Sequence, residues 1–241
     1  MPADTRSSLI YLAALISGAA ALIYQVSWIG MLSMTFGSTT LASAAVIGAF
    51  MLSMGLGARA YDRISRRFTN PFRFYGLLEV GIAATAAGVS SLIHALPGVY
   101  AALAGGPEAV SGNAFLRLAL AFILLLVPCL LMGATFPALC RAAIASRSAL
   151  NRHLGPIYGL NTLGAALGAL LAGLILIELV GRQASIWIAG LGNLAAAAIA
   201  WALAQQSGVR HDTTAVAASA DSDRRTPSVP LSVITVTLFV S

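Results

Sequence analysis

One carboxylate stands inside a long apolar run of this sequence, and its chemistry bears on the whole interpretation. In RFYGLLEVGIAATAAGV, residues 73–89, Glu79 is the only acid and follows Arg73 by six positions. Helical rise would put Glu79 about 9 Å into the run. An acid inside a membrane is costly, and it is expected to face other helices and to have a partner. Arg59 and Arg141 are the predicted partners. Three roles stay open, namely a structural charge pair, a protonatable coupling site and a cation ligand.

Other polar side chains also fall inside apolar stretches, namely Tyr24, Gln25, Asn161 and Asn193. Buried amides in lipid often form hydrogen bonds between helices. Interhelical bonding is therefore the first expectation for these residues, and cavity lining is the alternative. Glu178 and Arg182 stand four residues apart, a favourable spacing for an ion pair on one helix.

The sequence contains no pattern of a catalytic or metal site. No cluster of His, Cys and acidic residues has metal-ligand spacing. No strand, glycine-rich turn and helix follow one another as in dinucleotide-binding units. Cys129 and Cys140 lie eleven residues apart on one predicted helix, about 16 Å in rise, which is too far for a disulfide. We therefore predict no catalytic residue, no metal and no cofactor within residues 1–241.

The composition predicts an all-α polytopic membrane protein. The chain is 59% hydrophobic and 9% charged, whereas soluble domains carry about 25% charged residues. A helix that spans a bilayer needs about 20 mostly apolar residues. Six stretches meet this length, at roughly 9–31, 40–61, 74–96, 115–138, 157–180 and 184–205. The prediction is a bundle of six transmembrane helices.

The basic residues predict how this bundle is oriented. All fourteen are arginines, and only Arg117 and Arg182 fall on one side of the six predicted spans. The positive-inside rule then places both ends of the six-helix unit in the cytoplasm of a bacterial-type inner membrane. The basic charge is explained by this topology and by anionic headgroups. Nucleic acid is not an expected partner, because no basic surface interleaved with aromatic residues is present.

The chain divides into three predicted parts. Residues 1–206 form the transmembrane domain, and the polar, aromatic-free residues 207–228 form a flexible cytoplasmic linker. Residues 229–241 are too few to span and are expected to begin a further helix of a truncated chain. Residues 8–17 and 232–241 share three identities, which suggests a duplicated half of the kind found in transporters.

Two of the predicted spans carry residues that shape helices. Pro128 and Pro137 lie inside the fourth span, where they predict a packed kink or, alternatively, a hinge that lines a cavity. Gly164 and Gly168 in the fifth span form a small-xxx-small pair, which is typical of closely packed helices.

A loop motif and four longer segments carry a resemblance to known families. The motif Asp62, Arg63, Arg66 and Arg67, in GLGARAYDRISRR, resembles the loop between helices 2 and 3 of the major facilitator superfamily. The longer segments are similar, in order, to the membrane-embedded spermidine-synthase-like proteins; they are residues 17–63, 75–83, 131–141 and 158–173. Members often have a basic residue near the position of Gly30, which this chain lacks.

This resemblance implies a function for the membrane region. In the family, a facilitator-like region is fused to a polyamine aminopropyltransferase-like domain, which here would lie beyond Ser241. Residues 1–241 would then act as a membrane scaffold or anchor, or as a subunit of a larger assembly, without a catalytic site. The alternative is half of a facilitator-type transporter for a small, polyamine-like cation. The expected partners are the lipid bilayer and other membrane helices, from a second half of the chain or from another membrane complex.

Overall fold

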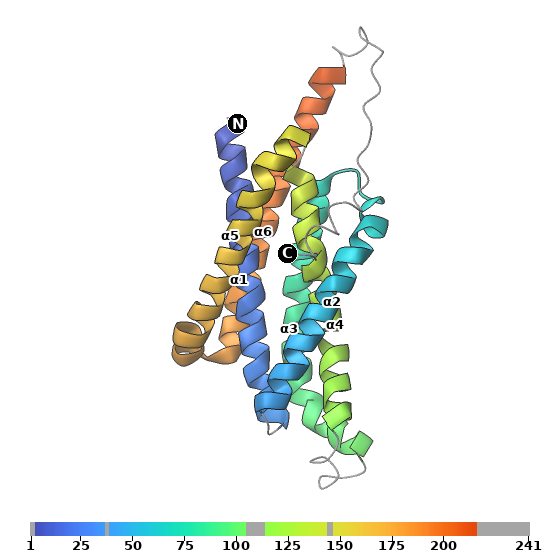
Figure 1. The fold of residues 1–241 in the computed structure, drawn as a ribbon, viewed down its shortest axis with the longest axis vertical. Helices are drawn as coiled ribbons and strands as arrows, with labels where there is room; N and C mark the ends of the chain where they lie inside the picture. The colour runs from blue at the N-terminus through green and yellow to red at the C-terminus, as the bar shows by residue number, and fades with distance from the viewer. Residues whose placement is uncertain (1–2, 37–38, 105–113, 144–146, 216–241) are drawn as a thin grey trace.

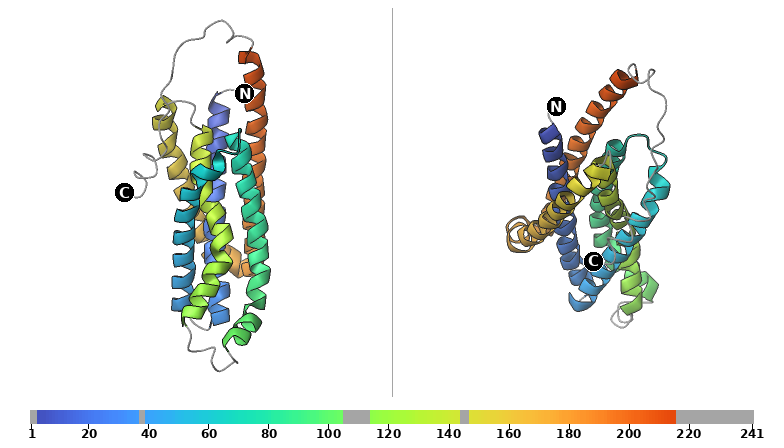
Figure 2. Two further views of the ribbon diagram at one scale, coloured as in Figure 1. Left: turned by 90° about the vertical axis from the view of Figure 1, so that its right-hand side faces the viewer. Right: turned by 45° about the horizontal axis from the view of Figure 1, so that its top comes forward.

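The computed structural model describes residues 3–36, 39–104, 114–143 and 147–215, and this part of the chain is helical apart from short links. The elements are α1 (Ala3–Phe36), α2 (Thr39–Ser65), α3 (Pro71–Ala104), α4 (Ala114–Ala143), α5 (Arg147–Leu171), the π-helical stretch η2 (Ala172–Leu176) and α6 (Ile177–Ala215). Successive helices run alternately down and up one long axis (Figure 1), along which they lie side by side (Figure 2). The all-α prediction is confirmed.

Gly181 divides α6 into two pieces. Its φ of 80° and ψ of 168° are not helical, and this positive φ is a conformation that glycine adopts without steric cost. Residues 177–180 therefore continue from η2, and a new helix begins at Arg182. The chain descends along α5 and returns along α6 (Figure 1). The break lies between the predicted spans 157–180 and 184–205.

Among the described residues, four helical segments are long and apolar enough to cross a membrane: Thr5–Thr35, Pro71–Val99, Leu118–Ala143 and His153–Gln206. The prediction of six separate spans is thus met only in part. α2 is not among the four, and several side chains near its start lie outside the described residues. The fourth segment covers the last two predicted spans and includes the Gly181 break between them.

α6 also changes the predicted domain boundary. The helix continues to Ala215, so its last residues occupy the start of the predicted linker 207–228. The remainder of that linker and the predicted helix start at 229–241 lie outside the described residues.

Glycines let two pairs of helices approach closely. A Cβ on Gly164 or Gly168 of α5 would collide with the backbone of Leu15 or Ala19 of α1. On the other side of the bundle, Gly57 of α2 lies against the Leu130 backbone of α4, and Gly133 of α4 lies against the Met54 backbone of α2. Such small residues allow backbone contact between helices in lipid.

We expect Gly164→Ala to destabilise the bundle by about 1–3 kcal/mol, because the added methyl group overpacks the contact with α1. Gly159→Ala on the same helix is the matched control, since a Cβ there has nothing within 4 Å. The control should be neutral or slightly stabilising, because alanine favours helix over glycine. Unfolding in mixed detergent micelles measures both, and equal stability of the two variants would contradict the predicted contact.

α4 contains both prolines without a break in the helix. Pro128 is buried and Pro137 half-buried, and α4 extends from Ala114 to Ala143. Cys129 and Cys140 of the same helix are free and buried.

The end of the bundle with the N-terminus and the α2–α3 link is here called the basic end. Arg141 of α4 donates to Ser65 Oγ of α2 over 2.9 Å, and Arg6 lies 5.5 Å from the ring centre of Phe72. The loop motif lies at the same end; its Asp62 is half-buried, and Arg63, Arg66 and Arg67 are exposed. Asn70 caps α3, accepting a hydrogen bond from the Phe72 amide at 3.0 Å.

Candidate functional site

The most concentrated polar chemistry in the described bundle is a network between α1, α3 and α6. Glu79 on α3 is 0% exposed. Ser17 Oγ of α1 donates to Glu79 Oε1 over 2.7 Å, and Asn193 Nδ2 of α6 donates to Glu79 Oε2 over 2.5 Å. Tyr24 of α1 donates its hydroxyl to Asn193 Oδ1 over 2.9 Å. These four residues, Ser17, Tyr24, Glu79 and Asn193, are called the polar network below.

Each member of the network forms its hydrogen bonds with residues of a neighbouring helix. Asn193 acts as both donor and acceptor, so its amide bridges Tyr24 and Glu79. Both carboxyl oxygens of Glu79 accept a hydrogen bond. In lipid an unsatisfied polar group costs several kcal/mol, so this complete pairing favours one arrangement of the three helices.

Aromatic side chains enclose the network. The Tyr24 ring stacks on Trp28, with 5.3 Å between ring centres. Tyr75 lies one helical turn before Glu79 and donates its hydroxyl to the Ala13 carbonyl over 3.4 Å. Both tyrosines and Trp28 are at most 1% exposed, which seals the carboxyl from the surface of the bundle in this conformation.

The prediction that Arg59 or Arg141 pairs with Glu79 is wrong. Arg141 donates to Ser65 at the basic end, and Arg59 is exposed on α2. Glu79 instead faces α1 and α6, the helices that supply Ser17 and Asn193. Helical rise estimates how deep a residue lies, but it does not say which neighbouring helix the side chain faces.

The network therefore holds its carboxyl with neutral donors. Ser17 and Asn193 carry no charge, and within the described residues no arginine binds Glu79. A site of this kind fixes helix positions through hydrogen bonds rather than through an ion pair.

The other polar residues singled out in the sequence lie in different places. Asn193 and Tyr24 are in the network. Gln25 is half-buried on α1, and Asn161 on α5 is half-buried where its backbone and side chain face Gly18 of α1. Ser17 was not predicted. A serine among small residues often returns its hydrogen bond to its own helix, so the sequence gives little sign of its role.

The ion pair predicted between Glu178 and Arg182 is not formed. The spacing favours pairing only on a continuous helix, and Gly181 breaks the helix between the two residues. Glu178 is exposed, whereas Arg182 Nη1 donates to Met34 Sδ of α1 over 3.9 Å.

The described residues contain no group of three or more His, Cys, Asp or Glu side chains that could hold a metal ion. Comparison with protein-family models, with curated proteins and with solved structures finds no match for this chain.

Proposed function

We propose that residues 1–206 form a six-helix membrane domain that acts as a scaffold or anchor in a larger membrane assembly, as the resemblance to spermidine-synthase-like proteins implies. The apolar run His153–Gln206 has 54 residues, about 81 Å if it were one helix. The hydrocarbon core is only about 30 Å thick. The reversal at Gly181 supports two crossings here, and α2 supplies the sixth.

The arginines support one orientation of this domain. The basic end contains Arg6, Arg63, Arg66, Arg67 and Arg141. Arg182 directly follows Gly181, in the turn between α5 and α6, and this turn lies toward the opposite end (Figure 1). The positive-inside rule favours a cytoplasmic basic end. The loop motif around Asp62 would then lie at the cytoplasmic headgroups of an inner membrane.

The burial of Glu79 is the observation that carries the scaffold role. In duplicated transporters the substrate site lies at the interface between the two repeats. Glu79 instead lies inside one six-helix unit, where it is 0% exposed and bound to its own helices. It does not lie on a surface that a second half would cover, so a tether between helices fits it better than a substrate ligand.

Cysteine accessibility tests the scaffold role against the transporter alternative. Ser17→Cys, in a Cys129→Ala/Cys140→Ala background, puts a thiol beside Glu79 with little change in size. In membranes that contain the full chain, we expect a membrane-impermeant thiol reagent to leave Cys at position 17 unmodified from either side. Thr69→Cys is the matched control, because Thr69 is exposed in the α2–α3 link.

The two proposals differ in outcome. A scaffold keeps the network closed, so only the Thr69→Cys control reacts before the protein is denatured. Alternating access would open a water-filled path, so reaction at position 17 in the native membrane, increased by spermidine or another polyamine, would overturn the scaffold role. It would favour a transporter for a small cation.

A further inference from the structure

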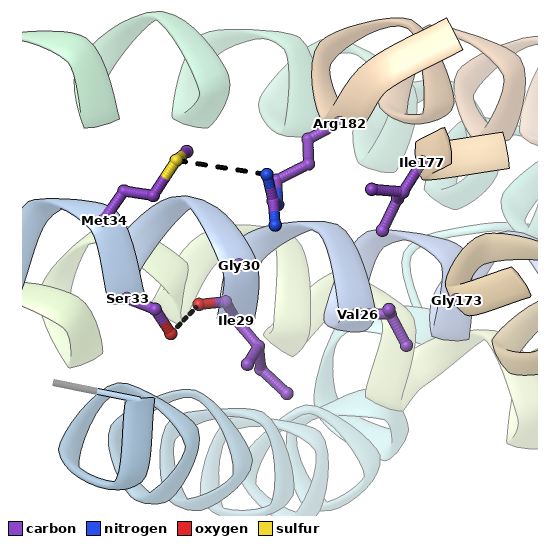
Figure 3. Close-up of a pocket in the computed structure, with 8 residues that line it drawn as sticks. All are labelled: Val26, Ile29, Gly30, Ser33, Met34, Gly173, Ile177 and Arg182. Carbon is purple, nitrogen blue, oxygen red and sulfur yellow. Dashed lines mark hydrogen bonds between the residues drawn. The ribbon is translucent and has the colours of Figure 1, made fainter. Parts of the chain in front are cut away.

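A shallow cavity of about 520 Å³, open to the surface of the bundle, lies between α1 and the turn that joins α5 to α6 (Figure 3). Its walls are mostly apolar and include Val26 and Ile29 of α1 and Ile177 of α6. Arg182, the first residue after the Gly181 break, contributes a guanidinium group to it. The cavity lies toward the opposite end of the bundle from the basic end (Figure 1), and none of the residues that line it belongs to the polar network.

Gly30 makes room for this guanidinium. A Cβ at position 30 would collide with Nε and Cδ of Arg182. The arginine side chain therefore lies directly over the α1 backbone. In Figure 3 it points toward α1 beside Gly30 and Met34. The location of the charge is set by α1 packing as well as by the Gly181 break.

The guanidinium lacks an anionic partner in the described part of the chain. Arg182 Nε is buried and has no hydrogen-bond partner, and Nη1 reaches only the thioether sulfur of Met34 at 3.9 Å. Thioether sulfur is a weak acceptor. Ser33, which also lines the cavity, gives its hydroxyl to the Ile29 carbonyl over 2.7 Å.

We propose that this cavity binds the phosphate group of an anionic phospholipid. A guanidinium binds phosphate through paired, charge-assisted hydrogen bonds. The amide groups at the start of the helix that begins at Arg182 add a favourable field for an anion. The apolar walls contact the first part of an acyl chain, which a free phosphate ion does not have. The proposal does not depend on the scaffold role.

Native mass spectrometry of the full chain in detergent tests this site. Titration with dioleoylphosphatidylglycerol is expected to show one bound lipid whose Kd is weakened about tenfold by Arg182→Gln, since a charge-assisted contact is lost. Arg63→Gln is the matched control, because Arg63 is exposed at the basic end and does not line the cavity. Equal weakening by both variants would overturn the site.

Three further arms identify the ligand and guard against misfolding. Arg182→Lys keeps the charge but not the planar fork, so we expect it to fold and to bind the lipid at a Kd between those of the wild type and Arg182→Gln. The Kd of a phosphate-free diacyl galactolipid should be the same for the wild type and for Arg182→Gln. If it binds with the same dependence, the phosphate assignment is wrong. If inorganic phosphate binds as tightly as the lipid, the site is a free-phosphate site and the lipid assignment fails.

Discussion

Asn193→Leu is expected to destabilise the bundle by about 2–4 kcal/mol, because it leaves two buried groups, the Glu79 carboxyl and the Tyr24 hydroxyl, each short of a hydrogen-bond partner. The side chain removed is 2% exposed and connects Glu79 to Tyr24. Leucine has the same branching and the same number of side-chain heavy atoms as asparagine, so the substitution leaves no cavity and the loss comes from the stranded polar groups. The midpoint of unfolding in mixed detergent micelles measures the effect.

A second substitution distinguishes this cause from general disruption of α6. In Glu79→Met/Asn193→Leu both partners become apolar, and removing both can be nearly neutral. We expect the double variant to recover part of the lost stability, since the Tyr24 hydroxyl still lacks its acceptor. The recovered part is the coupling energy between two side chains in contact. If Asn193→Leu costs the same with and without Glu79→Met, the two side chains are not coupled and the network is not the tether proposed.

Asn161→Leu is the matched control for the asparagine change. Asn161 is half-buried on α5 and faces Gly18 rather than Glu79. We expect it to cost at most about 1 kcal/mol, within the range of a single interhelical hydrogen bond in a membrane. A control as damaging as Asn193→Leu would show that amides anywhere in the bundle matter equally.

The sequence predicted the helices better than it predicted the contacts between them. Apolar runs of about 20 residues indicated where the helices lie, and the predicted limit between residues 180 and 184 falls next to the Gly181 break. The ion pair predicted in the same stretch is not formed. The pairing of Glu178 with Arg182 required a continuous helix, and the positive φ of Gly181 could not be read from its neighbours.

Three of the four members of the polar network were singled out in the sequence, but the hydrogen bonds between them were not predicted. Glu79, Asn193 and Tyr24 were identifiable because polar side chains stand out in apolar runs. Their mutual contacts depend on which faces α1, α3 and α6 present to one another, and a single sequence does not contain that information. Arg59 and Arg141 were the obvious cations near the same depth, yet they lie on α2 and α4, whereas the donors to Glu79 lie on α1 and α6.

Tyr24→Ala is expected to cost about 3 kcal/mol, the lower end of the range for deleting a buried aromatic ring. The lower end applies because helices in a bilayer lose packing rather than transfer from water. Tyr24 is 0% exposed and stacks on Trp28, so little around it can relax into the space. Unfolding in mixed detergent micelles measures the loss, with Tyr158→Ala at an exposed position of α5 as the control.

Tyr24→Phe separates the ring from its hydroxyl. It keeps the stack on Trp28 but leaves Asn193 Oδ1 without its donor, so we expect a smaller loss of about 1–3 kcal/mol. The loss should shrink in the Asn193→Leu background, where the hydroxyl has no acceptor to lose. If Tyr24→Phe is neutral, the Tyr24 hydroxyl does not belong to the network. Asn193 then joins α6 to α3, and Ser17 alone joins α1 to α3. If its cost persists without Asn193, the hydroxyl acts on another group, and the path from Tyr24 to Glu79 is wrong.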